Sequence, residues 1–305
     1  MIVLIGGNGF LGKHIAHLAS RRGEDVLIVS RSGRGDTAFT GVRHASIDML
    51  YNGHIDTELK DASSVLYLAS ASVPASNTEY PDIELVANVQ PAMRAAARLA
   101  EIGTGARFVY FSSGGTVYGR GHSRPIPETA ALAPITPYGL GKAQAEMAVE
   151  FFGRVRGLKY AVLRLGNPIG QWQHSTRQGL VGIALRCLRE GRPLQLFGDG
   201  KNLRDYFDAD DVAELVLKID AARELENGVW NVGSGVGTGE IELLGLMQGL
   251  IGRRLDIEKL PPRSVDLRYS VMDAGKAARD FRWSCTKTLR DSLSEIIARS
   301  VLNSD

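Results

Sequence analysis

Cysteine is scarce in this chain: only two of its 305 residues are cysteines. Cys187 falls in a predicted helix and Cys285 in a predicted loop, with no CxxC spacing and no pair of histidines nearby. This pattern argues against a disulfide framework and against a zinc site, so we expect no bound metal. A chain without disulfides fits a reducing compartment, and we therefore expect a cytoplasmic protein.

Strong charge and long apolar runs are also missing. Lysine and arginine number 36 and aspartate and glutamate 34, so the formal net charge is only +2. This balance, spread evenly along the chain, gives no reason to expect a nucleic-acid partner. No stretch of 18 apolar residues occurs, and the first residue leads directly into a predicted strand. We therefore expect neither a signal peptide nor a membrane span.

Glycine, in contrast, is abundant, with 35 copies, and three of them form a pattern near the start. Gly6, Gly9 and Gly12 follow the apolar run 2–5 and open a predicted helix over 10–22. A strand, a glycine turn and a helix in this order are typical of a dinucleotide-binding site. In such a site Gly6 would allow the turn, Gly9 would let backbone N–H groups approach a pyrophosphate, and Gly12 would let the helix pack closely. The alternative is a strand-to-helix turn that binds nothing.

Predicted strands and helices alternate through the first half of the chain. The strands cover residues 25–30, 42–47, 65–69, 107–112 and 160–165, and two long helices cover 82–102 and 137–155. Such alternation is typical of a parallel sheet with helices on its faces, so the predicted fold class is α/β. The alanine-rich run 95–97 indicates close helix packing, either within one subunit or between two.

After Leu165 the pattern changes to short pieces separated by glycine and proline. A helix over 180–190 and a strand over 194–197 indicate a second, smaller lobe. A helix over 210–222 and a strand over 229–232 fit a return to the first lobe. We therefore expect a dinucleotide-binding domain at 1–166, with 208–232 added, and a substrate lobe at 167–207 and 233–305.

Tyr138 and Lys142 form the second informative pattern, four residues apart on the predicted helix over 137–155. On a helix this spacing places both side chains on one face. An ammonium, together with the positive charge of an oxidised nicotinamide, would lower the pKa of the phenol, which could then take a proton from a sugar hydroxyl. The pair follows the predicted strand over 107–112, at the carboxyl edge of the sheet, where open α/β sheets bind ligands.

These patterns belong to a longer ordered series. In sequence order the chain contains Gly6-x-x-Gly9-x-x-Gly12, Phe111-Ser-Ser-Gly-Gly-Thr-Val-Tyr-Gly119, Pro137-Tyr-Gly-Leu-Gly-Lys142, Leu163-Arg-Leu-Gly-Asn167 and Arg204-Asp-Tyr206. Together they make the chain resemble, over nearly its whole length, the extended short-chain dehydrogenase/reductase family, and within it the nucleotide-sugar epimerases and dehydratases of the UDP-glucose 4-epimerase type. The resemblance implies a Rossmann-type doubly wound parallel sheet with a smaller α/β substrate-binding lobe.

The resemblance also implies roles for the catalytic candidates. Tyr138 would be the acid/base, and Lys142 would hold the nicotinamide ribose and polarise Tyr138. The chain has Gly114 where the family's epimerases carry a Ser or Thr, so Ser113 or Thr116 would supply the hydroxyl, unless Tyr138 acts without one. The family's dehydratases carry an Asp-Glu pair just after this position, where this chain has a glycine and a threonine, so dehydration is not expected.

By position, the resemblance further implies which residues bind the cofactor and the substrate. The cofactor contacts would be Gly6, Gly9, Phe10, Leu11, Gly12, Ser30, Arg31, Asp48, Met49, Leu68, Ala69, Ser70, Asn88 and Leu165, together with Tyr138 and Lys142. The substrate contacts would be Asn167, Leu180, Gln195, Phe197, Arg204 and Arg263. Of these, the asparagine and the two arginines would hold a diphosphate, as charge chemistry also favours, and Gln195 and Phe197 would touch the base. The alternative is a surface arginine and a buried strand aromatic.

The choice of cofactor depends on the end of the second predicted strand. An acidic residue there would bond the ribose hydroxyls of NAD, but the chain has Ser30 and Arg31. An arginine can bind a 2′-phosphate, so NADP is slightly favoured over NAD. Asp36 in the following loop could restore a preference for NAD, and Arg31 could be only a solvated loop charge.

The resemblance therefore implies an NAD(P)-dependent nucleotide-sugar 4-epimerase that acts through a 4-keto-sugar intermediate. Two alternatives stay open, because one fold supports many functions: a nucleotide-sugar 4-keto reductase or dehydrogenase, and a sensor that binds a dinucleotide without turnover. The implied partners are a nucleotide-diphosphate sugar and a second copy of the chain, which would form a homodimer through the helices over 82–102 and 137–155.

Overall fold

The computed structural model describes residues 1–35, 39, 41–74, 80–173, 179–222 and 224–302. Asp36, whose carboxylate bears on the choice of cofactor, lies outside the described residues. Within them, no helix is both long enough and apolar enough to cross a bilayer. Among the described residues, no three or more His, Cys, Asp or Glu side chains come together in a group that could hold a metal ion.

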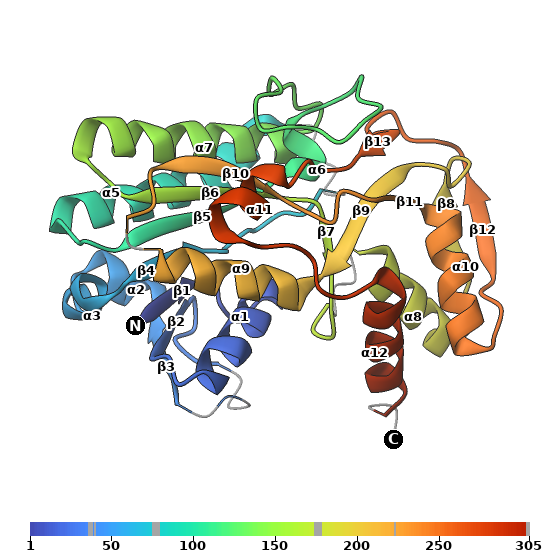
Figure 1. Ribbon diagram of the computed structural model, residues 1–305, viewed down its shortest axis with the longest axis horizontal. Helices are drawn as coiled ribbons and strands as arrows, with labels where there is room; N and C mark the ends of the chain where they lie inside the picture. Colours follow the sequence, from blue (N-terminus) through green and yellow to red (C-terminus); the bar gives the residue numbers. More distant parts are fainter. Residues whose placement is uncertain (36–38, 40, 75–79, 174–178, 223, 303–305) are drawn as a thin grey trace.

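Seven parallel strands form the central sheet of the described chain (Figure 1). In spatial order they are β10 (Gly228–Val232), β6 (Tyr160–Leu165), β5 (Arg107–Ser113), β4 (Ser64–Tyr67), β1 (Ile2–Ile5), β2 (Val26–Ser30) and β3 (Val42–Ser46). Every residue of β1 and β4 is buried, as strands covered on both faces require. The chain order reverses between β1 and β4, so the predicted doubly wound α/β fold is confirmed.

Helices cover both faces of this sheet (Figure 1). On one face α1 (Phe10–Arg21) packs against α9 (Ala209–Ala221), and on the other α5 (Gln90–Ile102) packs against α7 (Pro137–Arg156). Each face has its own cluster of buried apolar side chains. The short helices are α2 (Ile47–Tyr51), α3 (Asp56–Asp61), α6 (Gly114–Val117) and α11 (Gly275–Phe281). The sheet and these helices form a rigid frame whose carboxyl edge can position a site.

The segment predicted as one helix over 82–102 is built from three pieces. A short α4 (Pro81–Glu84) continues into the π-helical turn η1 (Leu85–Val89), and only then does α5 begin. Pro91 is the second residue of α5 and directly follows the π turn. Helical backbone continues from Pro81 to Ile102, and the wider π turn accommodates the proline within it.

The second lobe is assembled mainly from the later part of the chain. Its elements are β7 (Asn167–Ile169), α8 (Leu180–Glu190), β8 (Leu194–Phe197), β9 (Leu203–Asp208), β11 (Gly237–Gly239), α10 (Glu240–Ile251), β12 (Ile257–Leu260), β13 (Tyr269–Ser270) and α12 (Leu289–Leu302). Strand β9 pairs with β7, β11 and β13, while β8 pairs with β12. A third apolar cluster lies between these strands and helices α8, α10 and α12.

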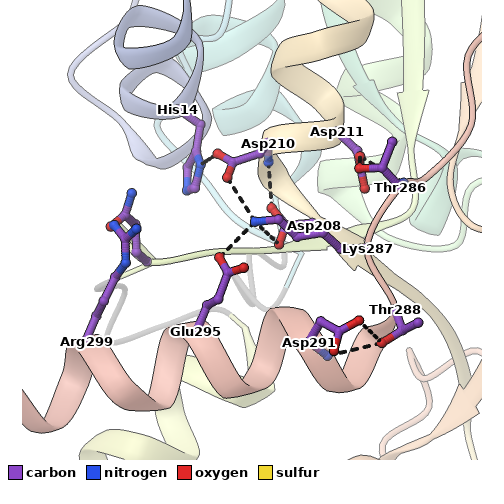
Figure 2. A network of polar contacts seen from close by, with 11 residues as sticks. His14, Asp208, Asp210, Asp211, Thr286, Lys287, Thr288, Asp291, Glu295 and Arg299 are labelled. Carbon is purple, nitrogen blue, oxygen red and sulfur yellow. Dashed lines mark hydrogen bonds and ion pairs between the residues drawn. The ribbon is translucent and has the colours of Figure 1, made fainter. Parts of the chain in front are cut away.

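A polar network connects the two lobes at the start of α9 (Figure 2). Nδ1 of His14, on α1, lies 2.6 Å from Oδ1 of Asp210. Nζ of Lys287 lies 3.4 Å from Asp208 and 3.3 Å from Asp210, and it donates a 2.8 Å hydrogen bond to Glu295 of α12. Hydrogen bonding to His14 and the charge of Lys287 lower the pKa of Asp210 to about 2. The network holds the carboxyl-terminal helix against the frame that carries the glycine turn.

Candidate active site

A large pocket lies at the carboxyl edge of the central sheet and extends into the second lobe. Its walls come from the segments that follow β1, β2, β4, β5 and β6, and from β7, α8, β8 and β9. This is where open α/β sheets bind their ligands, because the loops after parallel strands meet at one edge. The pocket therefore brings together residues from both lobes.

The glycine turn forms one end of this pocket. Gly6 has a φ of +83°, and a Cβ there would lie 2.6 Å from the backbone nitrogen of Ala69. A Cβ on Gly12 would lie 2.3 Å from the carbonyl oxygen of Gly7, so both positions require glycine. Gly9, in contrast, has space around it and is the N-cap of α1, with no side-chain cap and no acidic residue in the first turn. Backbone N–H groups and the positive end of the helix dipole are thus available for an anion.

Tyr138 and Lys142 lie one turn apart at the start of α7, and both line the pocket. Thr136 caps this helix by accepting a 3.1 Å hydrogen bond from the N–H of Gly139. The Lys142 side chain is only 9% exposed, and its Nζ donates a 2.8 Å hydrogen bond to the carbonyl oxygen of Phe111 at the end of β5. Its Nζ lies 5.6 Å from the centre of the Tyr138 ring. The phenol and the ammonium therefore share one face of the helix.

The pKa values of this pair differ from the sequence-based expectation. Burial and the negative charge of Glu84 raise the pKa of Tyr138 above its ordinary value, while a hydrogen bond with Ser113 opposes the shift. Burial lowers the pKa of Lys142 to about 8, against the charges of Glu146 and Glu84. The predicted lowering of the phenol pKa by Lys142 is thus not produced by the protein alone, because the ammonium donates to a carbonyl oxygen and two carboxylates lie nearby.

The chain has Gly114 where the family's epimerases carry a Ser or Thr, and a side chain of the second lobe fills the space beside this glycine. A Cβ on Gly114 would lie 2.2 Å from Sδ of Met272, and Met272 is fully buried. The thioether therefore occupies the space that a serine or threonine would need. Ser113 and Thr116 both line the pocket, but Thr116 directs its hydroxyl to the Ser113 carbonyl oxygen at 3.4 Å, whereas the Ser113 side chain lies close enough to Tyr138 to lower the pKa of its phenol. Ser113 is the better placed of the two.

The opposite end of the pocket carries the predicted substrate residues. All six line it, namely Asn167, Leu180, Gln195, Phe197, Arg204 and Arg263. The Arg263 guanidinium lies 4.4 Å from the centre of the Phe197 ring and pairs with Asp266 at 2.7 Å. Oδ1 of Asn167 is buried and has no hydrogen-bond partner among the described residues. Two arginines, an aromatic ring and an amide oxygen without a hydrogen-bond partner thus line one part of the pocket.

The whole-chain comparisons agree with this geometry. The profile of the NAD dependent epimerase/dehydratase family matches residues 2–233. This chain belongs to that family. The membership confirms the predicted resemblance.

Individual relatives of this epimerase/dehydratase family member match nearly its whole length. A UDP-glucose 4-epimerase of Mycolicibacterium smegmatis is 27% identical over 307 positions, covering 97% of this chain and 96% of the relative. A UDP-glucose 4-epimerase structure from Thermotoga maritima with UDP-glucose has a TM-score of 0.86 and 29% identity, covering 98% and 99% of the two chains. That of Thermus thermophilus in complex with NAD has a TM-score of 0.87 and 26% identity, covering 99% of each chain.

Most predicted cofactor contacts of this family member line the pocket, and three do not. Those that do are Gly6, Gly9, Phe10, Leu11, Gly12, Ser30, Arg31, Leu68, Ala69, Ser70, Tyr138, Lys142 and Leu165. Asp48 is exposed on α2, and Met49 packs against the core beneath it. Asn88 instead bonds to Ser72, Glu84 and the N–H of Ala71. It therefore fixes the loop after β4 rather than facing the pocket.

Several pocket residues were not found from the sequence. Ile47 and Tyr51 line the pocket from α2, and the Arg94 guanidinium lies 4.5 Å from the centre of the Tyr51 ring. The i, i+4 spacing of Ile47 and Tyr51 is the signal that could have identified this face. Trp172 and Arg186 line the pocket from the second lobe, where no motif marks them.

Proposed function

We propose that this protein is an NAD(P)-dependent nucleotide-sugar 4-epimerase that works through a 4-keto-sugar intermediate. One observation carries the proposal: the Tyr138–Lys142 pair lies on the same pocket as the glycine turn of α1 and the cationic groups of the second lobe. A dinucleotide site, an acid/base and a diphosphate site are the three parts that this reaction needs. The relatives' names and bound ligands support the same substrate class.

The residues present fit a nicotinamide dinucleotide. The first turn of α1 offers uncapped N–H groups, and the open space at Gly9 allows a pyrophosphate to approach them. Gly6, Leu68 and Ala69 would hold the middle of the cofactor, and Lys142 its nicotinamide ribose. When bound, the cofactor would supply a hydride acceptor and donor at the sugar carbon C4.

In the proposed mechanism Tyr138 takes the proton of the sugar 4-hydroxyl as that carbon is oxidised. The 4-keto sugar then turns, and Tyr138 returns the proton after reduction on the other face, so no net redox change results. Ser113 would bond to the sugar oxygen and to Tyr138. It would thereby take the role of the Ser or Thr that the family's epimerases carry where this chain has Gly114. Lys142 would keep positive charge beside the phenolate. Acid/base assistance of this kind typically contributes about 10² to 10⁴ in rate.

The second lobe would bind the nucleotide and leave the sugar free to turn. Arg204, Arg263 and the unpaired oxygen of Asn167 offer charge and hydrogen bonds to a diphosphate and the first sugar. Gln195 and Phe197 would contact the base, with Leu180 behind them. Holding the substrate by its nucleotide supplies binding energy without clamping the reacting ring.

For the cofactor we propose that NADP is accepted besides NAD. Ser30 and Arg31 line the pocket at the end of β2, and Arg31 is exposed toward solvent, where it can meet a 2′-phosphate. Binding of NAD and NADP to the purified protein, measured by calorimetry, tests this choice. Binding of NAD with no detectable binding of NADP would contradict the proposal.

A second copy of the chain is the partner we propose for the outer face of the helices on the α5–α7 side. This face exposes large apolar side chains, namely Ile83, Leu85, Val86, Met93, Leu140, Met147, Phe151 and Val155. Those of α7 from Met147 onward recur every four residues, as on a helix that packs against another. A dimer in sedimentation experiments that becomes monomeric in Met147→Glu would support this interface, and a monomeric wild type would exclude it.

The decisive experiment incubates the protein with UDP-glucose or UDP-N-acetylglucosamine and looks for the 4-epimers without stoichiometric reductant. Tyr138→Phe should lower kcat by about 10² to 10⁴, whereas Tyr160→Phe, outside the pocket, should not. Epimer formation that survives Tyr138→Phe contradicts the mechanism. Stoichiometric consumption of NADPH on a 4-keto sugar would favour the reductase, and dinucleotide binding without turnover the sensor.

A further inference from the structure

Glu84, the last residue of α4, is a buried acid that no sequence motif marks. It is 2% exposed and lies against α7. A Cβ on Gly141 would lie 3.3 Å from Cβ of Glu84 and 3.4 Å from its Oε2. Gly141 belongs to the same helical turn as Tyr138 and Lys142. A carboxylate is therefore packed against the turn that carries both proposed catalytic groups.

The hydrogen bonds of Glu84 connect three parts of the site. Its Oε2 accepts from the hydroxyl of Ser72 at 2.9 Å and from Nδ2 of Asn88 at 2.6 Å. Oδ1 of Asn88 in turn accepts from the N–H of Ala71 at 2.7 Å. Ala71 and Ser72 line the pocket in the loop after β4. Glu84 therefore ties this loop to η1 and packs their junction against α7 beside Gly141.

No cation in the described chain forms an ion pair with this carboxylate. Both of its hydrogen-bond donors are neutral, and its second oxygen, Oε1, is buried without a partner among the described residues. The titratable groups that respond to its charge are Tyr138 and Lys142 of α7 and Tyr110 of β5. The other acid near Lys142, Glu146, raises the pKa of that lysine more than Glu84 does, and it also pairs with Arg164. Of the two acids, only Glu84 also raises the pKa of the Tyr138 phenol.

We propose that Glu84 is a positioning residue, whose buried negative charge sets the proton affinity of the Tyr138–Lys142 pair and whose hydrogen bonds fix the pocket loop beside it. The inference rests on the proposed function, in which that pair moves the proton. A carboxylate in this place favours the charged form of Lys142 and disfavours the phenolate of Tyr138. Phenolate would therefore form only when substrate and cofactor change the field of the pocket.

The test removes the charge of the Glu84 side chain and keeps its shape. In Glu84→Gln the amide oxygen can still accept from Ser72 and Asn88, but the negative charge is gone. The readout is the titration of Lys142, followed through its Cε resonance in carbon-13-labelled lysine and assigned by its disappearance in Lys142→Met. We expect the midpoint, about 8 in the wild type, to move down by about one pH unit. The measurement needs neither cofactor nor substrate.

A matched control removes another acid from the same helix. Glu150→Gln changes a partly exposed carboxylate, two turns beyond Lys142, that pairs with Arg154. It should leave the Lys142 midpoint unchanged. If Glu84→Gln does not fold, Glu84→Asp withdraws the charge by one methylene and should move the midpoint in the same direction by less. A midpoint equal to that of the wild type in the folded Glu84 variant would overturn the inference.

Activity separates this inference from the proposed function. If the protein is an epimerase, the pH dependence of kcat should shift with the Lys142 midpoint in Glu84→Gln, while a purely structural role would lower kcat at every pH. If the midpoint moves and no epimer is formed by the wild type, the positioning role holds and the proposed reaction fails. If epimers are formed and the midpoint stays, the reaction holds and the positioning role fails.

Discussion

Two buried carboxylates act on Lys142 of α7, and they differ in the charge of their partners. Glu146 is 1% exposed and pairs with Arg164 of β6, whose Nη2 lies 2.7 Å from Oε2 and whose Nε lies 3.0 Å from the same oxygen. Glu84 is 2% exposed and has only neutral donors. The comparison teaches that burial alone does not assign a role to an acid. Both carboxylates favour the ammonium of Lys142, but the one paired with an arginine also holds elements together, whereas the one without a cation does not.

The Glu146 pair is the centre of a network that joins α7 to three neighbouring strands at one end of the sheet. Ser112 at the end of β5 donates to Glu146, and Nη1 of Arg164 donates a 2.9 Å hydrogen bond to the hydroxyl of Tyr118. That hydroxyl donates at 2.6 Å to Asn231 of β10. Because the charges of Glu146 and Arg164 compensate each other within these hydrogen bonds, the network fixes α7 against three strands.

The largest effect is expected from breaking the compensated pair. Arg164→Met leaves Glu146 buried without its cation, so the free energy of unfolding should fall by about 3–5 kcal/mol. Urea denaturation measures this change. Glu84→Gln removes a buried charge that has no cation, so it should not lower the free energy of unfolding. This opposite response of the two acids is the strongest test of the comparison.

A double variant checks the reason for that loss. Arg164→Met combined with Glu146→Leu removes both charges and should recover most of the stability, because the cost comes from the carboxylate left alone. A single variant that loses less than about 1 kcal/mol would mean that Glu146 finds another partner or a proton, and the distinction between the two acids would disappear.

An effect of intermediate size concerns the pH dependence of stability. Burial lowers the pKa of Lys142 from 10.5 to about 8, so between these values the unfolded chain binds more protons than the folded one. The free energy of unfolding of the wild type should therefore rise with pH in this window, relative to Lys142→Met, by about 3 kcal/mol in total. Denaturation at a series of pH values measures the difference, with Lys159→Met, an exposed lysine, as the control.

The same measurement sharpens the comparison of the two acids. In a Glu84→Gln background the rise should begin at a lower pH, because one of the two charges that favour the ammonium is gone. If the difference in free energy of unfolding between the wild type and Lys142→Met stayed constant from about pH 8 to about pH 10.5, that would contradict the low pKa of the buried lysine.

Much of the frame could be predicted because its signals are local. A buried strand, the turn at Gly6 and the helix from Phe10 follow one another in the sequence, and the i, i+4 pair of Tyr138 and Lys142 needs only a helix to share a face. The alternation of strands and helices then implies a parallel sheet. These features depend on neighbours along the chain, so one sequence contains them.

The rest depends on contacts between distant segments. Nothing near Gly114 in the sequence indicates that Met272 fills its space, and nothing near Glu84 indicates that it is buried rather than exposed on a helix. The π turn before Pro91, which ends α4 beside the pocket, also differs from the single helix that the pattern predicts. Periodicity identifies a helix but not which of its polar residues meets another element, because packing decides that.

The smallest effect expected comes from the cap of α7 and separates stability from charge. Thr136→Ala removes the oxygen that accepts from the N–H of Gly139, and it should lower the free energy of unfolding by about 1 kcal/mol. It alters no charge near the pair, so the Lys142 midpoint should stay at about 8. Denaturation and the lysine titration measure the two quantities on one sample. A midpoint that moved with the loss of the cap would show that loosening α7 is enough to shift it, and the shift in Glu84→Gln would then no longer identify a charge effect.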